Sequence, residues 1–220
     1  MQPLQPDTSY HIFNHANGFE NIFREPENYR YFLEKYQLYI SPIAETYAYC
    51  LMPTHFHLVV RIRKRDVIEG LIKSSKFPAS SINFTFPKVS NFGKGEIIIR
   101  DSDIEKYLSK QFANFFSCYT QSFNKVNLRR GSLFIKNFKR EPITSKDRFL
   151  NTVIYTHRNP IHHGFRERFE DWPYSSYFGI ISNDEPVVEI VKLLKIFGGL
   201  DQFKQKHIDS IKFLTDFEIP

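Results

Sequence analysis

One stretch of the sequence constrains the fold strongly, because it reads as a strand with a purely apolar face. The stretch is YCLMPTHFHLVV, residues 49–60. Side chains alternate between the two faces of a strand, so residues 56, 58, 60 and 62 share one face. These are Phe, Leu, Val and Ile, and we expect them to line the core. Residues 44–51 read as a preceding strand, and Met52-Pro53-Thr54 as the turn of a hairpin.

The opposite face of this strand carries two histidines, His55 and His57, followed by Val59 and Arg61. One interpretation is a strand that has polar residues on its second face. The other is a metal site, because imidazoles at positions i and i+2 of one strand can converge on a single ion when a third ligand comes from elsewhere. With an oxygen ligand and open positions, such a site suits Mg²⁺ or Mn²⁺ bridging a phosphate. The spacing alone leaves both interpretations open.

Hydrophobic periodicity and capping residues predict the remaining elements. We expect strands at residues 8–15 and 131–139. We expect helices at Pro26–Ile40 and Val67–Lys73, at 104–126 with Asp103 as its cap, at Lys146–Arg158 with Ser145 as its cap, and at about 186–197 and 200–214. Pro160 should end the fourth of these helices, because its ring disfavours the helical conformation at Asn159. The element order predicts an α+β fold with helices packed on an antiparallel sheet.

Two segments stand apart from this pattern. Residues 64–103 are rich in Ser, Asn, Phe and Pro and are interpreted as an insertion with little regular structure beyond its short helix. Residues 181–220 read as a C-terminal helical extension of a domain that spans residues 1–180.

A second group of polar side chains occurs at residues 153–164, VIYTHRNPIHHG. Tyr155 and Asn159 are four residues apart on a predicted helix, so they share one face and present a phenol and an amide oxygen together. His157 lies on a different face and is a poorer candidate.

Charge suggests a polyanionic partner. The net charge is +6 and the pI is about 9.2, which is only moderately basic for 220 residues. Six basic residues lie between positions 125 and 140 with no acidic residue among them: Lys125, Arg129, Arg130, Lys136, Lys139 and Arg140. A solvated loop would explain this run, and so would contact with nucleic-acid phosphates.

Other features narrow the class of protein. Cys50 and Cys118 are too few for a disulfide framework and indicate buried thiols in a reducing cytoplasm. No apolar run reaches transmembrane length, and we expect no membrane partner. There is no P-loop and no dinucleotide-binding glycine pattern, so we expect no nucleotide cofactor.

Four blocks of the sequence, in order, resemble one family. MPTHFHLVV resembles the His-hydrophobic-His signature of the HUH single-tyrosine transposases (IS200-like). GSLFIKNFKR, VIYTHRNPIHHGF and WPYSSY resemble the closing blocks of the REP-associated tyrosine transposase branch. The resemblance covers about residues 8–178.

This resemblance implies a ferredoxin-like sheet, with the two histidines on a central strand. Carried over by position, it implies that Tyr155 is the catalytic nucleophile, that His55 and His57 are metal ligands, and that Asn159 is the third ligand. The implied cofactor is a divalent metal, Mg²⁺ or Mn²⁺, and the implied substrate is single-stranded DNA beside a hairpin. Relatives imply both monomers and dimers, and the C-terminal extension favours a monomer here.

The resemblance further implies a single-strand DNA endonuclease and strand transferase that forms a covalent 5′-phosphotyrosine intermediate. Each step exchanges one phosphoester for another, which agrees with the absence of a P-loop. Two alternatives stay open: a non-catalytic or domesticated DNA-hairpin-binding protein on the same fold, and a phosphoesterase that uses water, with Tyr155 incidental.

Overall fold

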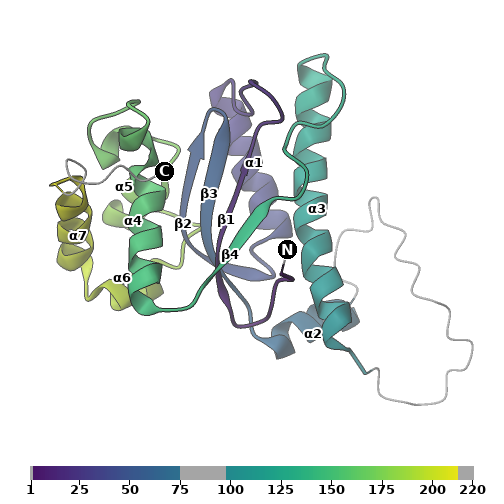
Figure 1. Cartoon of the computed structure of the whole chain (residues 1–220). Helices are drawn as coiled ribbons and strands as arrows, with labels where there is room; N and C mark the ends of the chain where they lie inside the picture. The colour runs from purple at the N-terminus through teal and green to yellow at the C-terminus, as the bar shows by residue number, and fades with distance from the viewer. Residues whose placement is uncertain (1, 75–97, 213–220) are drawn as a thin grey trace, which may run out of the picture.

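The computed structural model describes residues 2–74 and 98–212 (Figure 1). In chain order its elements are β1 (Ser9–His15), α1 (Pro26–Tyr39), β2 (Ala44–Met52), β3 (His55–Ile62), α2 (Arg65–Ser74), α3 (Asp101–Val126), β4 (Lys139–Ile143), α4 (Lys146–His162), a 3-10 helix (Phe169–Asp171), α5 (Ser176–Ser182), α6 (Ile190–Phe197) and α7 (Leu200–Lys212). Within the described ranges, no helix is both long enough and apolar enough to cross a membrane.

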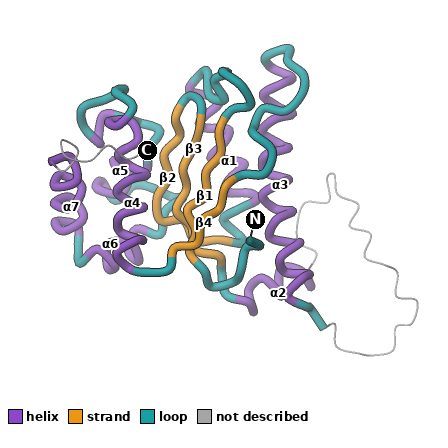
Figure 2. The backbone as a smooth tube through the Cα atoms, viewed as in Figure 1, coloured by secondary structure: helices purple, strands orange, loops and turns teal. Residues whose placement is uncertain are grey.

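The described strands form one antiparallel sheet in the order β2-β3-β1-β4 (Figure 2). β2 and β3 form the predicted hairpin, and β1 lies between β3 and β4. The chain order β1-α1-β2-β3-α3-β4 combined with this strand order is the ferredoxin-like arrangement. The expected α+β fold is therefore confirmed, with the histidine strand β3 at an interior position.

Helices cover both faces of the sheet (Figure 1). On one face, the ring of Phe56 in β3 packs against Phe32 of α1 and Phe116 of α3, with ring centroids 5.3 and 5.6 Å apart. On the other face lies α4, with α5, α6 and α7 beside it. The apolar face of β3 thus lines the core with α1 and α3, as the alternation predicted. The histidine face is turned toward α4.

The prediction of a strand at residues 131–139 is wrong. This segment is a loop in which Asn137 has a φ of 65°, and Phe134 forms an isolated bridge with Ala16. The strand begins only at Lys139, and its sequence KREPI lacks the apolar alternation that would predict a strand. Pro142 is accommodated because β4 is an edge strand, where a missing N–H need not interrupt the sheet.

The prediction that the helix beginning at Lys146 ends at Arg158 is also wrong, because α4 continues through Pro160 to His162. Proline lacks the N–H that would bond the carbonyl of Thr156 four residues earlier. The side chain of Asn159 compensates, since its Nδ2 donates to the carbonyl oxygens of Tyr155 at 2.9 Å and of Thr156 at 3.4 Å. The predicted start is correct: the Ser145 hydroxyl accepts a hydrogen bond from the backbone N of Arg148.

The long helix α3 begins at Asp101, earlier than expected, and its N-cap is Arg100. Asp103 is therefore not the cap but the third helical residue, where its carboxylate accepts a hydrogen bond from the backbone N of Arg100 at 3.1 Å. The short helix predicted at 67–73 is present as α2. The expected lack of structure in the rest of the insertion concerns mainly residues 75–97, which lie outside the described residues.

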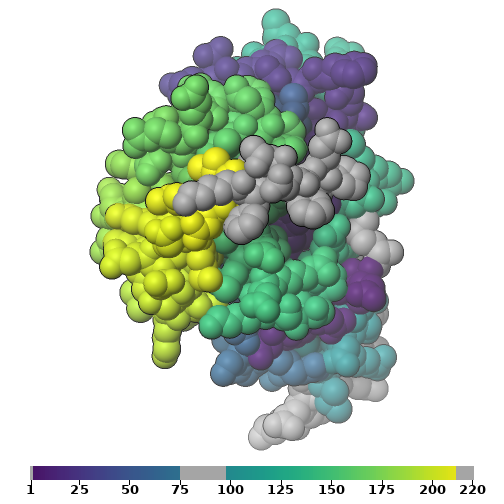
Figure 3. Space-filling model, turned by 60° about the vertical axis from the view of Figure 1, so that its left-hand side comes forward, coloured from purple at the N-terminus to yellow at the C-terminus, as the bar shows by residue number. Residues whose placement is uncertain are grey.

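The C-terminal helices α6 and α7 lie against the region of α4 and α5 (Figures 1 and 3). Their residues Leu193, Phe197 and Phe203 belong to the same apolar core as the sheet. The boundary near residue 180 stays a prediction. The described part of the extension nevertheless packs as an integral layer of the fold.

Candidate active site

The candidate site is built on two neighbouring strands whose polar side chains face α4. In the register of β1 with β3, Phe13 lies opposite His57 and His15 lies opposite His55. Directly opposite residues of an antiparallel pair project to the same face, so His11, Phe13 and His15 share the face of the two predicted ligands. His55 and His57 are buried, with 5% and 4% of their surfaces exposed.

Helix α4 brings Tyr155 and Asn159 to these histidines. The ring centroid of Tyr155 lies 5.4 Å from that of His57 and 5.9 Å from that of His11, both edge-on. Oδ1 of Asn159 lies 3.4 Å from Nε2 of His55. The structure therefore gathers in one place the four residues that the sequence singled out from two segments a hundred residues apart.

The orientation of the Asn159 amide follows from its contacts with the helix backbone. Its Nδ2 is committed to the carbonyl oxygens of Tyr155 and Thr156, so its Oδ1 must face the other way, toward His55. The carbonyls of Tyr155 and Thr156 together thus hold the amide oxygen of Asn159 in the site, and the second of them is the carbonyl that Pro160 cannot bond.

The Nδ1 atoms of both predicted ligands already have partners. Nδ1 of His55 lies 3.1 Å from the Thr54 hydroxyl, and Nδ1 of His57 lies 2.9 Å from Nε2 of His11. In metal sites, a histidine ligand is held in the same way by a hydrogen bond at its second ring nitrogen. Nε2 of His55 faces Oδ1 of Asn159, so an ion bound between these two atoms would replace their hydrogen bond.

Burial sets the protonation of the site. Desolvation lowers the pKa of His55 to about 4, against a smaller opposing effect of the Asn159 hydrogen bond. Burial also lowers the pKa of His57 well below its usual value, and the neighbouring His11 adds to the effect. Both rings are therefore neutral at pH 7, which is the form that binds a metal.

The Tyr155 phenol is half-buried, and burial raises its pKa above the usual value. Arg158, one turn along α4, opposes this rise, and Glu141 adds to it. The phenol is protonated at pH 7, so it needs activation before it can act as a nucleophile.

The donor atoms fit an open divalent-metal site. Two neutral imidazole nitrogens and one amide oxygen are suitable ligands, and two atoms bound to the same ion at about 2.1 Å lie roughly 3.0–3.4 Å apart. The separation of 3.4 Å between Nε2 of His55 and Oδ1 of Asn159 agrees with this. Within the described ranges, no group of three or more His, Cys, Asp or Glu side chains is placed to hold a metal ion, so the predicted site depends on the amide oxygen of Asn159 as its third ligand.

Comparison with known proteins identifies a sequence and a structure that resemble this chain. No protein family model matches the chain. A Haemophilus influenzae protein named "Putative REP-associated tyrosine transposase" is 24% identical over 177 residues, which are 79% of this chain and 75% of that protein. The chain is therefore similar in sequence to a protein named as a REP-associated tyrosine transposase.

A solved structure described as "Structure of the REP associates tyrosine transposase bound to a REP hairpin" covers 85% of this chain and 87% of its own, with 15% identity and a TM-score of 0.49. The similarity to the tyrosine transposases rests on the sequence match. The assignment of the fold rests on the order of the strands in the sheet.

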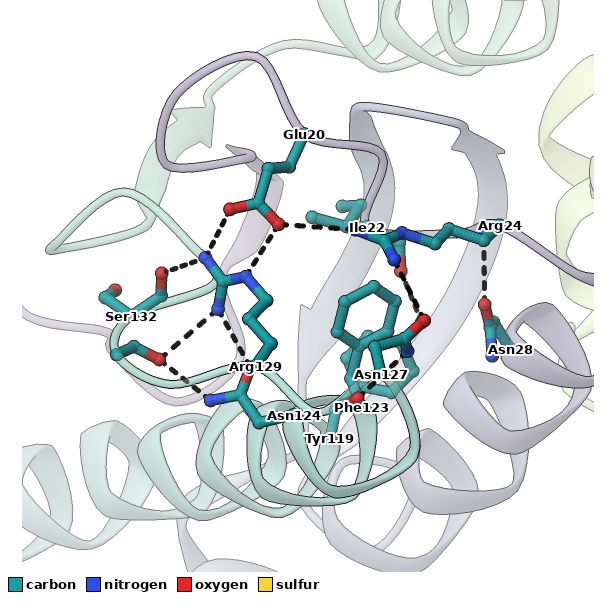
Figure 4. A network of polar contacts seen from close by, with 11 residues as sticks. Glu20, Ile22, Arg24, Asn28, Tyr119, Phe123, Asn124, Asn127, Arg129 and Ser132 are labelled. Atoms are coloured by element: carbon teal, nitrogen blue, oxygen red, sulfur yellow. Dashed lines mark hydrogen bonds and ion pairs between the residues drawn. The ribbon is translucent and has the colours of Figure 1, made fainter.

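The six basic residues predicted to bind DNA have different surroundings in this structure. Arg129 is held inside the protein: its Nε and one terminal nitrogen donate to the two carboxylate oxygens of Glu20 at 2.6 and 2.8 Å (Figure 4). It also donates to Asn124 and to the carbonyl of Ser132. Only 15% of its side chain is exposed. The structure therefore gives Arg129 a role in holding loops together, and its contact with a phosphate stays a prediction.

Lys136 and Arg140 line an open groove of about 390 Å³ between α3 and residues 132–140. None of the described residues that line it is acidic, and several are hydroxyl or amide side chains, including Ser109, Ser117 and Thr120. The guanidinium of Arg140 lies 4.9 Å from the Phe138 ring centroid. Asn14 of β1 also borders the groove, and Asn14 belongs to the face opposite the histidines.

Lys139 occupies the histidine face instead. It lies opposite Phe13 in the register of β1 with β4, and Phe13 lies opposite His57. With strands about 4.8 Å apart, its Cα is roughly 10 Å from that of His57. Lys125 and Arg130 are exposed near the distal end of α3. Of the six, Lys139 is the residue whose placement on the site's face is fixed by the sheet.

His11 and His15 were not predicted from the sequence, and His163 was not expected beside His55. The ring of His15 stacks on His55 with centroids 4.8 Å apart, and the ring of His163 lies 5.1 Å from it. The alternation His-x-Phe-x-His in β1 carried the signal, because it marks a second polar strand face. Its position beside His55 and His57 depended on the pairing of β1 with β3.

Proposed function

We propose that this chain is a metal-dependent single-stranded DNA endonuclease and strand transferase, which acts through a covalent 5′-phosphotyrosine on Tyr155 at hairpin-associated sites. The observation that carries the proposal is the meeting of the Tyr155 ring with the His57 ring at 5.4 Å, beside the 3.4 Å approach of Asn159 to His55. The name of the Haemophilus relative supports the same chemistry.

The reaction would proceed by direct phosphoester exchange. The Tyr155 oxygen would attack the scissile phosphorus, forming a tyrosine–phosphate bond as the bond to the 3′-oxygen breaks. The phenol loses a proton and the departing 3′-oxygen gains one, so the number of protons and phosphoesters is unchanged. Attack of another 3′-hydroxyl on the phosphotyrosine would reverse the step and join strands.

His55, His57 and Asn159 are the proposed ligands. A divalent cation held there would withdraw charge from the scissile phosphate and fix it near the phenol. The residues of the chain prepare this site in two ways. Burial keeps both imidazoles neutral, and the backbone contacts of Asn159 aim its oxygen at His55.

The substrate is proposed to be single-stranded DNA, because a helix-borne tyrosine reaches a phosphodiester most easily in a flexible strand. Lys139, on the face of the histidines, is the proposed phosphate contact nearest the site. Lys136 and Arg140 would act from the groove beside α3. Lys125 and Arg130 stay proposed contacts of the flanking DNA.

A single chain supplies all four proposed site residues, which supports a monomer acting in cis. The alternative of a DNA-hairpin-binding protein without catalysis has no use for a phenol, an amide oxygen and two neutral imidazoles in one place. A phosphoesterase that uses water would share the metal ligands but would leave Tyr155 dispensable.

One assay separates these functions. Hairpin-flanked single-stranded DNA carrying a 3′ label is incubated with protein and Mn²⁺ and resolved on a denaturing gel. We expect a labelled, protease-sensitive adduct, because the 3′ fragment would keep the 5′-phosphate that bonds to tyrosine. A 5′ label should give only a free fragment.

The matched variants are Tyr155→Phe and His55→Ala, which should abolish the adduct, and Tyr39→Phe, a phenol on α1 across the sheet, which should retain it. Cleavage that survives Tyr155→Phe would indicate hydrolysis by water. Binding of hairpin DNA without cleavage of either label would indicate a binding protein.

A further inference from the structure

We propose that His11 is a positioning residue, which holds His57 in the tautomer whose Nε2 is free to bind an ion. The inference rests on the metal site of the proposed function and assigns a role to a residue outside its ligand set. It starts from one contact: Nε2 of His11 lies 2.9 Å from Nδ1 of His57.

The contact is enclosed and well defined. His11 is 8% exposed and His57 is 4% exposed, and the two rings stack with centroids 5.1 Å apart and planes 18° from parallel. His11 comes from β1 and His57 from β3, so the sheet register fixes their approach. The ring of His11 also meets Phe13 at 4.8 Å and Tyr155 at 5.9 Å, which leaves little freedom for it to turn away.

Two neutral imidazoles at this distance share a single proton. If His11 donates from Nε2, then Nδ1 of His57 accepts and the proton of His57 sits on Nε2, where it blocks an ion. If His57 donates from Nδ1, its Nε2 keeps a lone pair for the ion. The second arrangement is the one that a metal site requires.

The neighbouring ligand has a comparable partner. Nδ1 of His55 lies 3.1 Å from the Thr54 hydroxyl, which can accept its proton when an ion replaces the hydrogen bond from Nε2 of His55 to Oδ1 of Asn159. Each predicted ligand therefore has its own partner at Nδ1, one a hydroxyl and the other an imidazole. A purely space-filling role for His11 would require only its ring, whereas the proposed role requires its Nε2 as an acceptor. Substitutions can distinguish the two roles.

Two substitutions separate the ring from its nitrogen. His11→Phe keeps a planar ring between Phe13 and Tyr155 but removes the acceptor. His11→Gln loses the ring but can place an amide oxygen near the position of Nε2. His162→Phe, which changes an exposed histidine at the end of α4, is the control for loss of a histidine.

The first readout is the tautomer of His57 in metal-free protein, from long-range ¹H–¹⁵N spectra of the imidazoles at pH 7.5. The signal is assigned by its loss in His57→Phe. We expect the Nδ1–H form in the wild type, in His11→Gln and in His162→Phe, and a shift toward the Nε2–H form in His11→Phe. A wild-type His57 in the Nε2–H form, or an unchanged tautomer in His11→Phe, would overturn the inference.

The second readout is Mn²⁺ affinity, measured by titration without DNA. We expect His11→Phe to bind Mn²⁺ about 10–100-fold more weakly than wild type. His11→Gln should recover most of this loss, and His162→Phe should match wild type. Equal affinity of His11→Phe and wild type overturns the inference while leaving the metal site intact. Binding that is unchanged in His57→Phe overturns the metal site itself, and with it the role given to His11, whatever the tautomer.

Discussion

His157 of α4 and His207 of α7 face each other in the protein interior, with Nδ1 of His157 2.9 Å from Nε2 of His207. Nδ1 of His207 donates to the carbonyl of Phe203 at 2.7 Å, so its Nε2 must accept the proton of His157. Nε2 of His157 lies 2.8 Å from the Ser176 hydroxyl, whose oxygen accepts from the backbone N of Tyr49 and lies 3.3 Å from the Tyr49 carbonyl oxygen. A chain of hydrogen bonds thus joins α7, α4, α5 and β2, and burial lowers the pKa of both histidines in it.

The first prediction is that this chain makes the protein sensitive to acid. Burial lowers the pKa of His207 to about 4 in the folded state, from 6.5. The folded state therefore binds protons less readily than the unfolded state, so its stability is full above pH 6.5 and falls as pH drops toward 4. From His207 alone, the free energy of unfolding should fall by about 2 kcal/mol between pH 7.5 and pH 5.

Urea unfolding of the wild type and of His207→Gln at both pH values checks this. Burial also lowers the pKa of His11 and His55 to about 4, so the wild type should lose stability for several reasons. The difference between the two proteins gives the joint contribution of His207 and its partner His157, whose pKa is lowered by burial and by His207. Equal losses in wild type and variant would show that His207 does not contribute.

The second prediction concerns Arg129, which bridges Glu20 to the loop after α3 (Figure 4). Arg129→Ala should lower the Tm by about a few degrees, because it removes a bidentate ion pair and leaves the Ser132 carbonyl without this donor. Arg130→Ala, its exposed neighbour, should leave the Tm unchanged. Thermal unfolding of the two variants makes the comparison.

In DNA binding, Arg130→Ala should have the larger effect and Arg129→Ala the smaller one. Arg130→Ala should reduce the salt dependence of DNA affinity, and Arg129→Ala should leave the slope unchanged at temperatures where it is folded. A reduced slope in Arg129→Ala, with an unchanged Tm, would return this residue to the DNA surface.

The contrast between these two arginines shows where sequence reasoning stops. The basic run predicts a charged surface, but nothing near Arg129 in the chain reveals Glu20, which arrives from the loop after β1. The same limit hid the role of His11, because its contact with His57 depends on the pairing of β1 with β3. Features that depend on one element alone, such as the burial of the apolar face of β3, were predicted correctly.

Local rules failed where tertiary structure overrode them. Pro160 was expected to end α4, but the Asn159 amide supplies the missing hydrogen bond and the helix continues. KREPI has no apolar periodicity, yet it forms β4 because β1 offers an unpaired edge. Tyr155 and Asn159 were placed on one helix face by spacing alone, and their approach to the histidines then required the whole fold.

The third prediction concerns Lys139. Lys139→Gln should slow DNA cleavage and reduce the salt dependence of single-strand binding by about 0.7 in log–log slope, the value for one phosphate contact. Its stability should change little, because the side chain is exposed at a sheet edge. Lys192→Gln is the matched control, since Lys192 on α6 is paired with Glu45 and Glu189. An equal effect of both substitutions would mean that only net charge matters.

The fourth prediction separates two roles of Asn159. Its Nδ2 satisfies the Thr156 carbonyl, which Pro160 cannot bond, and its Oδ1 faces His55. Asn159→Ala should therefore reduce stability by about 1–3 kcal/mol, the cost of an unsatisfied buried carbonyl, and should also weaken Mn²⁺ binding. In a Pro160→Ala background the helix gains the backbone N–H that bonds this carbonyl, so the stability loss should shrink.

The Mn²⁺ loss should persist in that background, because no backbone group replaces Oδ1 of Asn159 beside His55. Urea unfolding and Mn²⁺ titration of wild type, both single variants and the double variant complete the cycle. A coupling between Asn159 and Pro160 in stability, without coupling in metal affinity, is the expected result. Restored Mn²⁺ affinity in the double variant would mean that Asn159 acts only on the helix backbone and is not a ligand.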